Sequence, residues 1–403
     1  MPVDRTVGQD LAQALVDLYT DAQTRLAVDV ARRLDSGWDL PDWAERKLEG
    51  LNNLRRFAAN LLQDLDSRMA DEVAQATILA FVRGGTAAID DLARANSRRF
   101  DARLAAESGN VSAQLLAMIE GRAAGAAAQL AEARLALPGI GALQRLTFSL
   151  VSQLRGTHLR ILRWNTDVYR EVIARVGTPD VLLGLATRRR AAQVAWEELL
   201  TRGVTGFVDR SGRGWELSSY VEMATRTGTA QAAVEGHLDR LGAAGLDLVI
   251  VSDAPQECER CRPWEAKILT RGDGPGGRRT VRAEHATIDG RQIDVRVAGS
   301  VREAVRAGLM HPNCRHSFSA YLPGVTKAPT NTQDPEGDKA RQRLRALERK
   351  VRAEKLKAAA ALDPAARKAH EAKVRAAQAQ IRDHVKATGL IRQPGREQIG
   401  VAR

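Results

Sequence analysis

Aromatic residues and cysteines are scarce in this sequence, and each scarcity excludes a class of protein. Phe, Trp and Tyr make up 4% of the 403 residues, while 44% of the residues are hydrophobic. The core must therefore be built mainly from alanine, leucine and valine, a composition that suits long helices packed through small side chains. Three cysteines are too few for a disulfide framework, so we expect synthesis in a reducing cytoplasm.

Long hydrophobic runs are also absent. The first ten residues are polar and charged, without the apolar stretch of a secretory signal peptide. No run of about 18 apolar residues occurs anywhere in the sequence. We therefore predict no transmembrane helix and no membrane partner.

Positive charge dominates and gathers near the C-terminus. The formal net charge is +12, which favours a polyanionic partner such as nucleic acid or an acidic protein surface. Residues 326–403 contain 19 lysine and arginine residues against 9 acidic residues. The candidate nucleic-acid- or partner-binding residues are Arg341, Arg343, Arg345, Arg349, Lys350, Arg352, Lys355 and Lys357. This segment has no aromatic residue to stack on bases, so it would contact phosphates alone; a solvated helix face is the alternative.

Residues 1–200 form the first predicted region, a succession of helices. Apolar residues recur every three or four positions between Asp10 and Leu34, which is the spacing of one helix face. A second helix is predicted to begin at Pro41 and to run through Leu65. Later helices are expected to be interrupted at Gly84–Gly85, Gly109–Asn110, Pro138–Gly139 and Gly177–Pro179. A helical bundle and a long stalk both fit this pattern.

The other two predicted regions are residues 201–325 and 326–403. In the first of them the β-branched run Leu246–Ser252 predicts a strand, and Asp289–Gly290 is the favoured two-residue turn of a hairpin around Ile288–Ile293. After a polar linker, the last region is predicted to form a basic helical hairpin. Its first helix covers Asp338–Ala361, and its second begins after the N-cap Asp363 and ends at Gly389.

All three cysteines fall in two short segments that suit a metal ion. Cys258 and Cys261 form a C-x2-C pair, and Cys314 lies between His311 and His316 later in the chain. Zinc takes four nitrogen or sulfur ligands in a tetrahedron, and a C-x2-C turn lets two thiolates reach one ion. We favour Cys314 and His316 as the remaining ligands, with His311 as a close rival. Four protein ligands would close the site and make the zinc structural; buried free thiols are the alternative.

These patterns together predict the fold class. The protein is expected to be mainly α, with a small α+β zinc-binding module within residues 201–325. A long N-terminal helical region precedes this module, and the C-terminal basic helical hairpin follows it. Zinc would staple loops that cannot bury a sufficient core alone.

Enzymatic alternatives rest on the same residues. Cys258 with His311 or His316 could form a Cys–His hydrolase, although a metal ion would occupy that thiolate. A zinc-dependent nuclease could use His285 or His311 as its base. No carboxylate cluster suited to a catalytic metal stands out in the sequence, so we expect a protein that is not an enzyme.

A polar-aromatic cluster lies at the start of the helix that follows residue 214. Its members are Arg213, Trp215, Tyr220, Glu222 and Arg226. Glu222 and Arg226 are four residues apart, which predicts an ion pair on one helix face. We interpret the cluster as a structural brace.

Several segments between residues 200 and 390 together resemble a known family. They are Asp209–Thr227, Val251–Ser252, Cys258 with Cys261, Pro263–Lys267, His311–His316, Tyr321–Gly324 and the basic helix around Arg341–Arg343. In this order they are similar to the phage minor capsid protein 2 family, which is related to the Mu F-type head morphogenesis proteins. Residues 1–200 match only in their helical character. Ala266 departs from the pattern because the family often has glycine in W-x-G-K, so we expect a shifted loop there that leaves the ligands untouched.

The resemblance implies a function that sequence physics alone does not. It implies a structural protein of the virion, present in few copies in the phage head after synthesis in the cytoplasm of a bacterial host. The implied partners are the portal protein or the major capsid protein, and the packaged double-stranded DNA. The N-terminal helices are the expected portal or capsid contact, and their alanine-rich faces would permit self-association. The alternative is a packaged zinc-dependent nuclease or Cys–His hydrolase.

Overall fold

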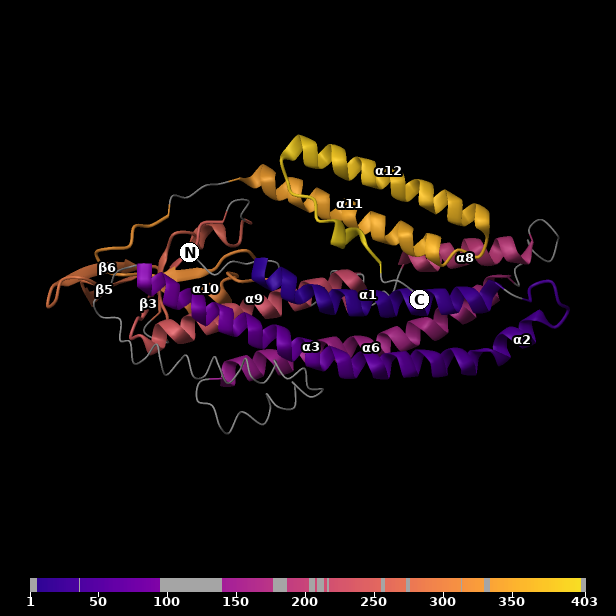
Figure 1. Cartoon of the computed structure of the whole chain (residues 1–403), viewed down its shortest axis with the longest axis horizontal. Helices are drawn as coiled ribbons and strands as arrows, with labels where there is room; N and C mark the ends of the chain where they lie inside the picture. The colour runs from indigo at the N-terminus through magenta and orange to yellow at the C-terminus, as the bar shows by residue number, and fades with distance from the viewer. Residues whose placement is uncertain are drawn as a thin grey trace. The chain divides into compact units, whose positions relative to one another are not determined.

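The structure is a computed structural model that describes most of the chain. The described residues are 6–35, 37–94, 140–176, 187–202, 207–208, 214–215, 217–254, 258–272, 276–312, 314–329 and 334–399. The fold is mainly helical with a few short strands, as predicted (Figure 1). The predicted interruptions at Gly109–Asn110, Pro138–Gly139 and Gly177–Pro179 lie outside the described residues, as does most of Asp209–Glu216.

The chain divides into two compact units, each assembled from three separate segments. Unit 1 comprises Met1–Ala14, Ala70–Val151 and Met223–Asp338, and unit 2 comprises Leu15–Met69, Ser152–Glu222 and Lys339–Arg403. The three predicted regions follow the order of the sequence, whereas both units combine early and late segments.

The N-terminal helices begin close to where the apolar spacing predicts. The helices of this part of the chain are α1 (Thr6–Asp35), α2 (Trp43–Glu49), α3 (Leu51–Arg94), α6 (Gly141–Val176) and α8 (Arg188–Arg202). The second predicted helix is divided in two, because Gly50 ends α2 before α3 begins. A two-residue strand pair, β1 (Phe207–Val208) with β2 (Gly214–Trp215), precedes α9 (Leu217–Ala243).

The predicted interruption at Gly84–Gly85 is wrong, because α3 runs unbroken through both glycines. A Cβ atom on Gly84 would lie 1.9 Å from the backbone oxygen of Ala233, and one on Gly236 would lie 2.0 Å from that of Phe81. Backbone atoms of α3 and α9 therefore approach so closely within unit 1 that these positions exclude any side chain. Here glycine permits close helix packing and does not end the helix.

The core of unit 2 is made from early and late helices together. Side chains of α1, α3, α6 and α8 pack with Leu356 near the end of the first of the last two long helices, and with Ala360 and Leu362 in the connection that follows it. The buried indole of Trp196 donates a hydrogen bond to the Ala360 backbone oxygen at 2.7 Å, and the Leu362 amide donates to the Gln193 side chain at 2.6 Å. The turn at residues 360–363 is thus fixed to α8.

The predicted helical hairpin is confirmed as α11 (Pro335–Ala359) and α12 (Pro364–Thr388), which lie side by side (Figure 1). Asp363 caps α12 by accepting a hydrogen bond from the Ala366 amide at 2.7 Å. Gly389 ends the helix in the left-handed conformation, with φ of 69°. Buried Leu344, Val351, Ala377 and Ile381 join the two helices.

Unit 1 contains a four-stranded sheet. The predicted strand Leu246–Ser252 is observed as β3 (Leu248–Val251), and all four of its residues are buried. Strand order is β7-β4-β3-β8, in which β3 is antiparallel to both neighbours and β7 is parallel to β4. The other strands are β4 (Ile268–Thr270), β7 (Gly299–Ser300) and β8 (Phe318–Ala320). Ser300 and Glu303 form a capping box that starts α10 (Val301–Arg306).

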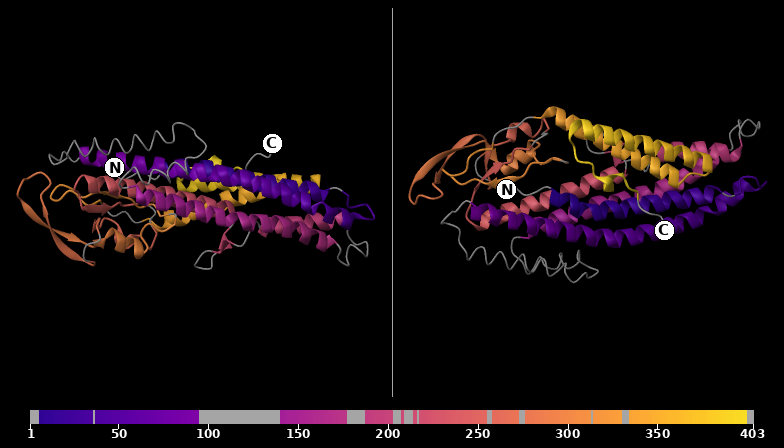
Figure 2. Two further views of the ribbon diagram at one scale, coloured as in Figure 1. Left: turned by 90° about the horizontal axis from the view of Figure 1, so that it is seen from below. Right: turned by 45° about the horizontal axis from the view of Figure 1, so that its top comes forward.

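The predicted hairpin exists, and Asp289–Gly290 is the centre of a turn in which the Arg291 amide donates to the Ile288 backbone oxygen at 3.4 Å, but the paired strands end before they reach this turn. Strands β5 (Arg279–Glu284) and β6 (Gln292–Val297) pair from Arg279 opposite Val297 to Glu284 opposite Gln292, and form an extended ribbon (Figure 2). Asp289–Gly290 lies inside the connection between them. The loop is held open because the Ala286 amide donates to the Pro323 oxygen and the Gly290 amide donates to the Glu284 carboxylate. These contacts replace the ladder that a tight turn would continue.

Within the described part of the chain, no helix combines the length and the apolar character that a bilayer crossing requires.

Candidate metal centre

Strand pairing brings the two predicted ligand segments together. Val251 at the end of β3 faces Phe318 at the start of β8, and the Ser252 amide donates to the Ser317 backbone oxygen at 2.9 Å. Cys258 and Cys261 follow β3, while Cys314 and His316 precede β8. Because the two strands are antiparallel, both segments emerge at the same end of the sheet.

The C-x2-C pair forms a tight turn. The amides of Cys261 and Arg262 both donate to the backbone oxygen of Cys258 at 3.1 Å, and the short 3-10 helix Arg262–Trp264 follows. This turn directs both thiols toward the second segment. There the Cys314 amide donates to the His311 backbone oxygen at 2.8 Å, which closes the second turn.

All five predicted ligands lie in one cluster. The Cys258 Sγ atom is 2.9 Å from His311 Nε2, the Cys261 Sγ atom is 3.5 Å from Cys314 Sγ, and Cys314 Sγ is 3.6 Å from His316 Nδ1. Cys258, Cys261 and His311 form one group of donor atoms within 4.8 Å of one another, and Cys261, Cys314 and His316 form a second. Cys261 belongs to both groups, so a single ion beside it could be held by this cluster.

Each histidine offers the cluster one nitrogen and binds the protein with the other. His311 Nδ1 donates to the Pro312 backbone oxygen at 2.7 Å, which leaves Nε2 facing Cys258. His316 Nε2 donates to Glu265 Oε1 at 2.7 Å, which leaves Nδ1 facing Cys314. Metal-binding histidines usually donate their second N–H to a carboxylate or a backbone carbonyl in this way. Both imidazoles are therefore oriented as ligands.

The neighbouring thiols and burial favour the protonated form of the Cys261 side chain. The hydrogen bond with Cys314, burial, and the neighbouring Cys258 hold the pKa of Cys261 above its ordinary value. Cys261 is fully buried, within an apolar cluster that includes Val251, Leu269 and Phe318. A cation would supply the opposite charge that three adjacent thiolates need. These residues are thus suited to a soft divalent ion such as zinc.

Glu265 is the part of this site that the sequence analysis did not find. Its side chain is fully buried, and Oε1 also accepts a hydrogen bond from the Ala254 amide at 3.3 Å. It thereby fixes the His316 ring from behind. No spacing rule connects Glu265 with His316, because strands β4, β5 and β6 lie between them in the sequence. The available signal was a charged carboxylate in a segment whose other residues predict burial.

The departure at Ala266 has a conformational consequence. Ala266 has φ of 57°, in the left-handed region that glycine favours. Its amide still donates to the Val251 backbone oxygen at 3.2 Å. The loop therefore places an alanine in the conformation that suits the family's glycine.

Ala266→Gly is expected to stabilise the protein by about 0.5–1 kcal/mol. The left-handed conformation costs a non-glycine residue about 1–2 kcal/mol, and the greater freedom of glycine in the unfolded chain offsets part of that gain. Chemical denaturation would measure the change, with Ala254→Gly in a neighbouring buried loop as a control expected to destabilise. An Ala266→Gly variant that is less stable than the wild type would contradict the inferred backbone strain at Ala266.

His285, the proposed base of a nuclease, belongs to neither group of metal-ligand atoms among the described residues. Its Nδ1 atom lies 3.3 Å from the amide and from the hydroxyl of Thr287. Its ring packs against Gly324, where an added Cβ would lie 2.3 Å away. These contacts describe a side chain that braces a loop.

The basic residues predicted on the first hairpin helix differ in their exposure and in their contacts with other side chains. Arg343, Arg349 and Lys350 are exposed, while Arg352 is buried. Arg345 and Arg352 each lie 4.0 Å from the Glu222 carboxylate. Lys355 donates to the Gln398 side chain, and Lys357 lies 3.6 Å from Glu354.

Glu222 and Glu348 form the centre of this network, which belongs entirely to unit 2. Arg396 lies 3.3 Å from Glu222 and 3.9 Å from Glu348. Burial raises the pKa of Glu348 to about 7, and the nearby Glu222 carboxylate adds to the shift. Glu222, one member of the predicted polar-aromatic cluster, thus lies beside C-terminal arginines, and part of the C-terminal positive charge is used inside the unit.

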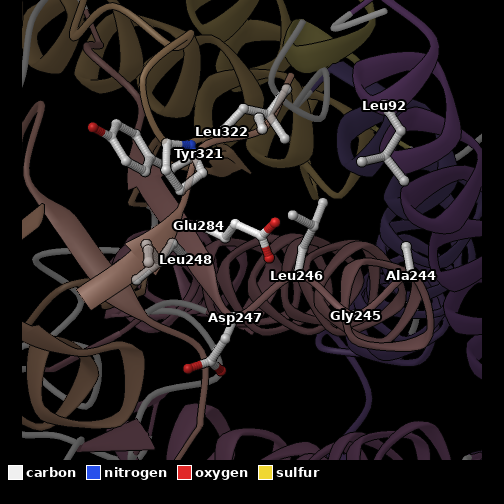
Figure 3. A pocket seen from close by; sticks show the side chains of 12 residues that line it. Leu92, Ala244, Gly245, Leu246, Asp247, Leu248, Glu284, Tyr321 and Leu322 are labelled. Carbon is white, nitrogen blue, oxygen red and sulfur yellow. The ribbon is translucent and has the colours of Figure 1, made fainter. Parts of the chain in front are cut away.

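A cavity of about 270 Å³ lies in unit 1, apart from the cysteines (Figure 3). Its lining residues are Leu92, Ala244, Gly245, Leu246, Asp247, Leu248, Ala283, Glu284, Ala286, Tyr321, Leu322 and Pro323. Asp247 accepts a hydrogen bond from the Gly272 amide, and Glu284 accepts one from the Gly290 amide. Both carboxylates therefore brace loops, and the remaining lining is largely apolar.

Comparison with known proteins identifies one family. The model of the family described as phage minor capsid protein 2 matches residues 7–131 and, in a second overlapping stretch, residues 122–386. The two matches together cover most of the chain, including both ligand segments and the hairpin. Comparisons with curated proteins and with solved structures gave no match.

Proposed function

The chain belongs to the phage minor capsid protein 2 family, and on that premise we propose that it is a structural component of a tailed-phage head, located at the portal vertex and required for head assembly. The observation that carries this proposal is the Cys/His cluster, which offers five protein donors. Each of its histidines is anchored by its second nitrogen. An ion held by four of these donors would stabilise a module and would leave no coordination position for a substrate.

The cluster would hold one structural Zn²⁺ ion through Cys258, Cys261, Cys314 and one imidazole. His316 is favoured as the fourth ligand because it is buried and bound to the buried carboxylate of Glu265, an arrangement that orients the ring and increases its basicity. His311 remains the rival. His316→Ala should abolish zinc binding while His311→Ala weakens it, and elemental analysis of the two variants would reveal a reversed assignment.

The ion would act as a staple for unit 1. The segments on either side of the site contain short strands and long loops, and they bury a small apolar cluster around Val251, Leu269 and Phe318. A bound ion adds folding free energy that such a module lacks. The protein would then bind its partners through surfaces of its helices. These partners are the portal protein or the major capsid protein, packaged DNA, and further copies of this chain.

Loss of the chain from the phage is expected to leave heads that do not mature. Removing a portal-vertex component should stop assembly before DNA fills the head, and a plasmid copy of the gene should restore it. Electron microscopy would count filled heads, and mass spectrometry of purified particles should find this chain in fewer copies than the major capsid protein.

Two variants separate the structural role from the enzymatic alternative. A plasmid carrying Cys314→Ser should fail to restore filled heads, because the module does not fold, whereas His285→Ala should restore them fully. A packaged nuclease or hydrolase would behave differently: normal heads would form, and a well-folded His285→Ala or Cys258→Ser protein would lose a measurable activity. Filled heads without the chain would refute the assembly role.

A further inference from the structure

The outer face of α12 carries basic residues that the internal network leaves available. Six basic residues of α12 are exposed. Lys373 lies on another side of the helix, and the other five are Arg367, Lys368, Arg375, Arg382 and Lys386. None of the five forms an ion pair with another residue in the described part of the chain. They differ in this respect from Arg345 and Arg352 of α11, whose guanidinium groups lie near Glu222.

The five residues share one side of the helix. At 100° per residue they fall within an arc of about 100°, and at 1.5 Å per residue they extend over about 28 Å of the helix axis. Glu371 lies within this arc and Asp383 lies about 60° beyond it, so the stripe keeps an excess of positive charge. A straight row of cations of this length matches a linear polyanion.

Another side of α12 is packed against its own unit, which fixes the direction of the stripe. Ala377 and Ile381 are fully buried against α11. Buried His370 lies 2.7 Å from Glu354 of α11 and 3.2 Å from Glu197 of α8. Asp363 caps the start of the helix. The cations therefore project from a rigid element of unit 2.

We propose that this stripe of α12 binds the phosphate backbone of duplex DNA. The inference rests on the proposed head function, and it assigns the DNA contact to α12, whereas the sequence pointed to α11. Arginine is the predominant residue of the stripe, and its guanidinium group donates two hydrogen bonds to a phosphate.

Neighbouring side chains favour duplex DNA over other polyanions. Helix α12 contains no aromatic residue, so it cannot stack on the bases of a single strand. Beside the stripe, the exposed surface of the helix includes the small side chains of Ala372 and Ala376. An acidic protein partner would need a large apolar or aromatic side chain at the centre of its interface, and this face offers none. Phosphate contacts along a duplex need only charge and reach.

Salt-dependent binding of the full-length chain to a mixed-sequence duplex tests the assignment. The triple variant Arg375→Gln/Arg382→Gln/Lys386→Gln should bind about a hundredfold more weakly at ~0.1 M salt, and the slope of log K against log salt should fall by about 3, because each lost phosphate contact removes about 0.9. Fluorescence anisotropy at several salt concentrations would measure both. Circular dichroism would verify that the exposed glutamines leave the fold intact.

Two matched triple variants carry the same loss of charge. Arg55→Gln/Arg163→Gln/Arg170→Gln changes exposed residues of α3 and α6 in the same unit and should bind DNA nearly as the wild type does. Arg343→Gln/Arg349→Gln/Lys350→Gln changes the exposed residues of α11 and should have the smaller effect. An equal loss of DNA affinity in all three variants would show that binding depends on net charge alone, and would overturn the assignment to α12.

Two further outcomes would also overturn it. An α12 variant that binds DNA as the wild type does would remove the stripe as a site. Polyglutamate binding that depends on α12, without DNA binding that does so, would point to an acidic protein partner. Neither outcome touches the head function, because the count of filled heads without the chain is measured independently.

Discussion

Substitution of Cys261 by serine is expected to remove zinc and to lower the melting temperature of unit 1 by about 10–20 °C. Cys261 is the one residue common to both groups of ligand atoms, so its loss leaves neither group complete. Structural zinc contributes about 10 kcal/mol or more to the smallest modules. A loss of about 5 kcal/mol would be enough for the predicted shift in a domain of this size.

Chelation supplies the matched experiment. A strong chelator should lower the wild-type melting temperature to that of the Cys261→Ser variant, and should leave the variant itself unchanged, because the variant has no ion to lose. Elemental analysis should give about one zinc per wild-type chain. Ala304→Ser is the control for a new hydroxyl group, since Ala304 is fully buried in the same apolar cluster and is not a ligand.

A different pattern would refute the zinc centre. Wild-type protein without metal, and without a response to chelator, would show that the cluster is three buried thiols beside two histidines. Cys258 would then be available as a nucleophile beside His311 Nε2, and the hydrolase alternative would gain support.

Gly84→Ala is expected to destabilise unit 1 by about 3 kcal/mol or more. The new methyl group would lie 1.9 Å from the Ala233 backbone oxygen, and a backbone atom cannot move aside as a flexible side chain can. The helices α3 and α9 would have to separate. Gly236→Ala should have a similar effect from the other side, because its Cβ would lie 2.0 Å from the Phe81 oxygen.

Two other glycines in helices provide controls in the same chain. The nearest atom to a Cβ on Gly85 is 3.5 Å away in the Arg240 side chain, and a Cβ on Gly156 has no neighbour within 4 Å. Alanine at either position should be neutral or stabilise by up to about 1 kcal/mol, the ordinary difference in helix propensity. Chemical denaturation would compare the variants. Equal stability of Gly84→Ala and Gly85→Ala would contradict the close approach of α3 and α9.

The Cys/His cluster was predictable because its donors are local in sequence. Cys258 and Cys261 share a turn, and His311, Cys314 and His316 share another, so two short segments revealed five donors. The pairing of β3 with β8 was not predictable from those segments. Glu265 was missed for the same reason: a carboxylate behind a histidine is defined by the fold, which brings residues together from distant positions.

The glycines show where prediction from neighbouring residues alone fails. Gly50 and Gly389 end helices, as glycine often does, whereas Gly84 and Gly236 lie inside helices where two backbones meet. The residue type is the same in both roles. Only the position of the second helix distinguishes them, and no periodicity in α3 encodes that position.

Charge patterns have the same ambiguity. In the sequence, nothing distinguishes Arg345 and Arg352 on α11 from Arg375 and Arg382 on α12. The first two lie beside Glu222, more than a hundred residues earlier in the chain. The number of charged residues located the basic hairpin correctly. To distinguish the arginines that face Glu222 from those that face outward, the contacts of Glu222 in the structure were needed.

The interleaving of the two units imposes an order on folding during synthesis. Every segment of unit 1 has been translated once Asp338 leaves the ribosome, whereas unit 2 also requires Lys339–Arg403. Until then the apolar side chains of α8 lack their contacts with Leu356, Ala360 and Leu362, and Trp196 has no acceptor at Ala360. The nascent chain would thus expose the α8 surface longest, which makes that surface the natural point for a ribosome-associated chaperone to act.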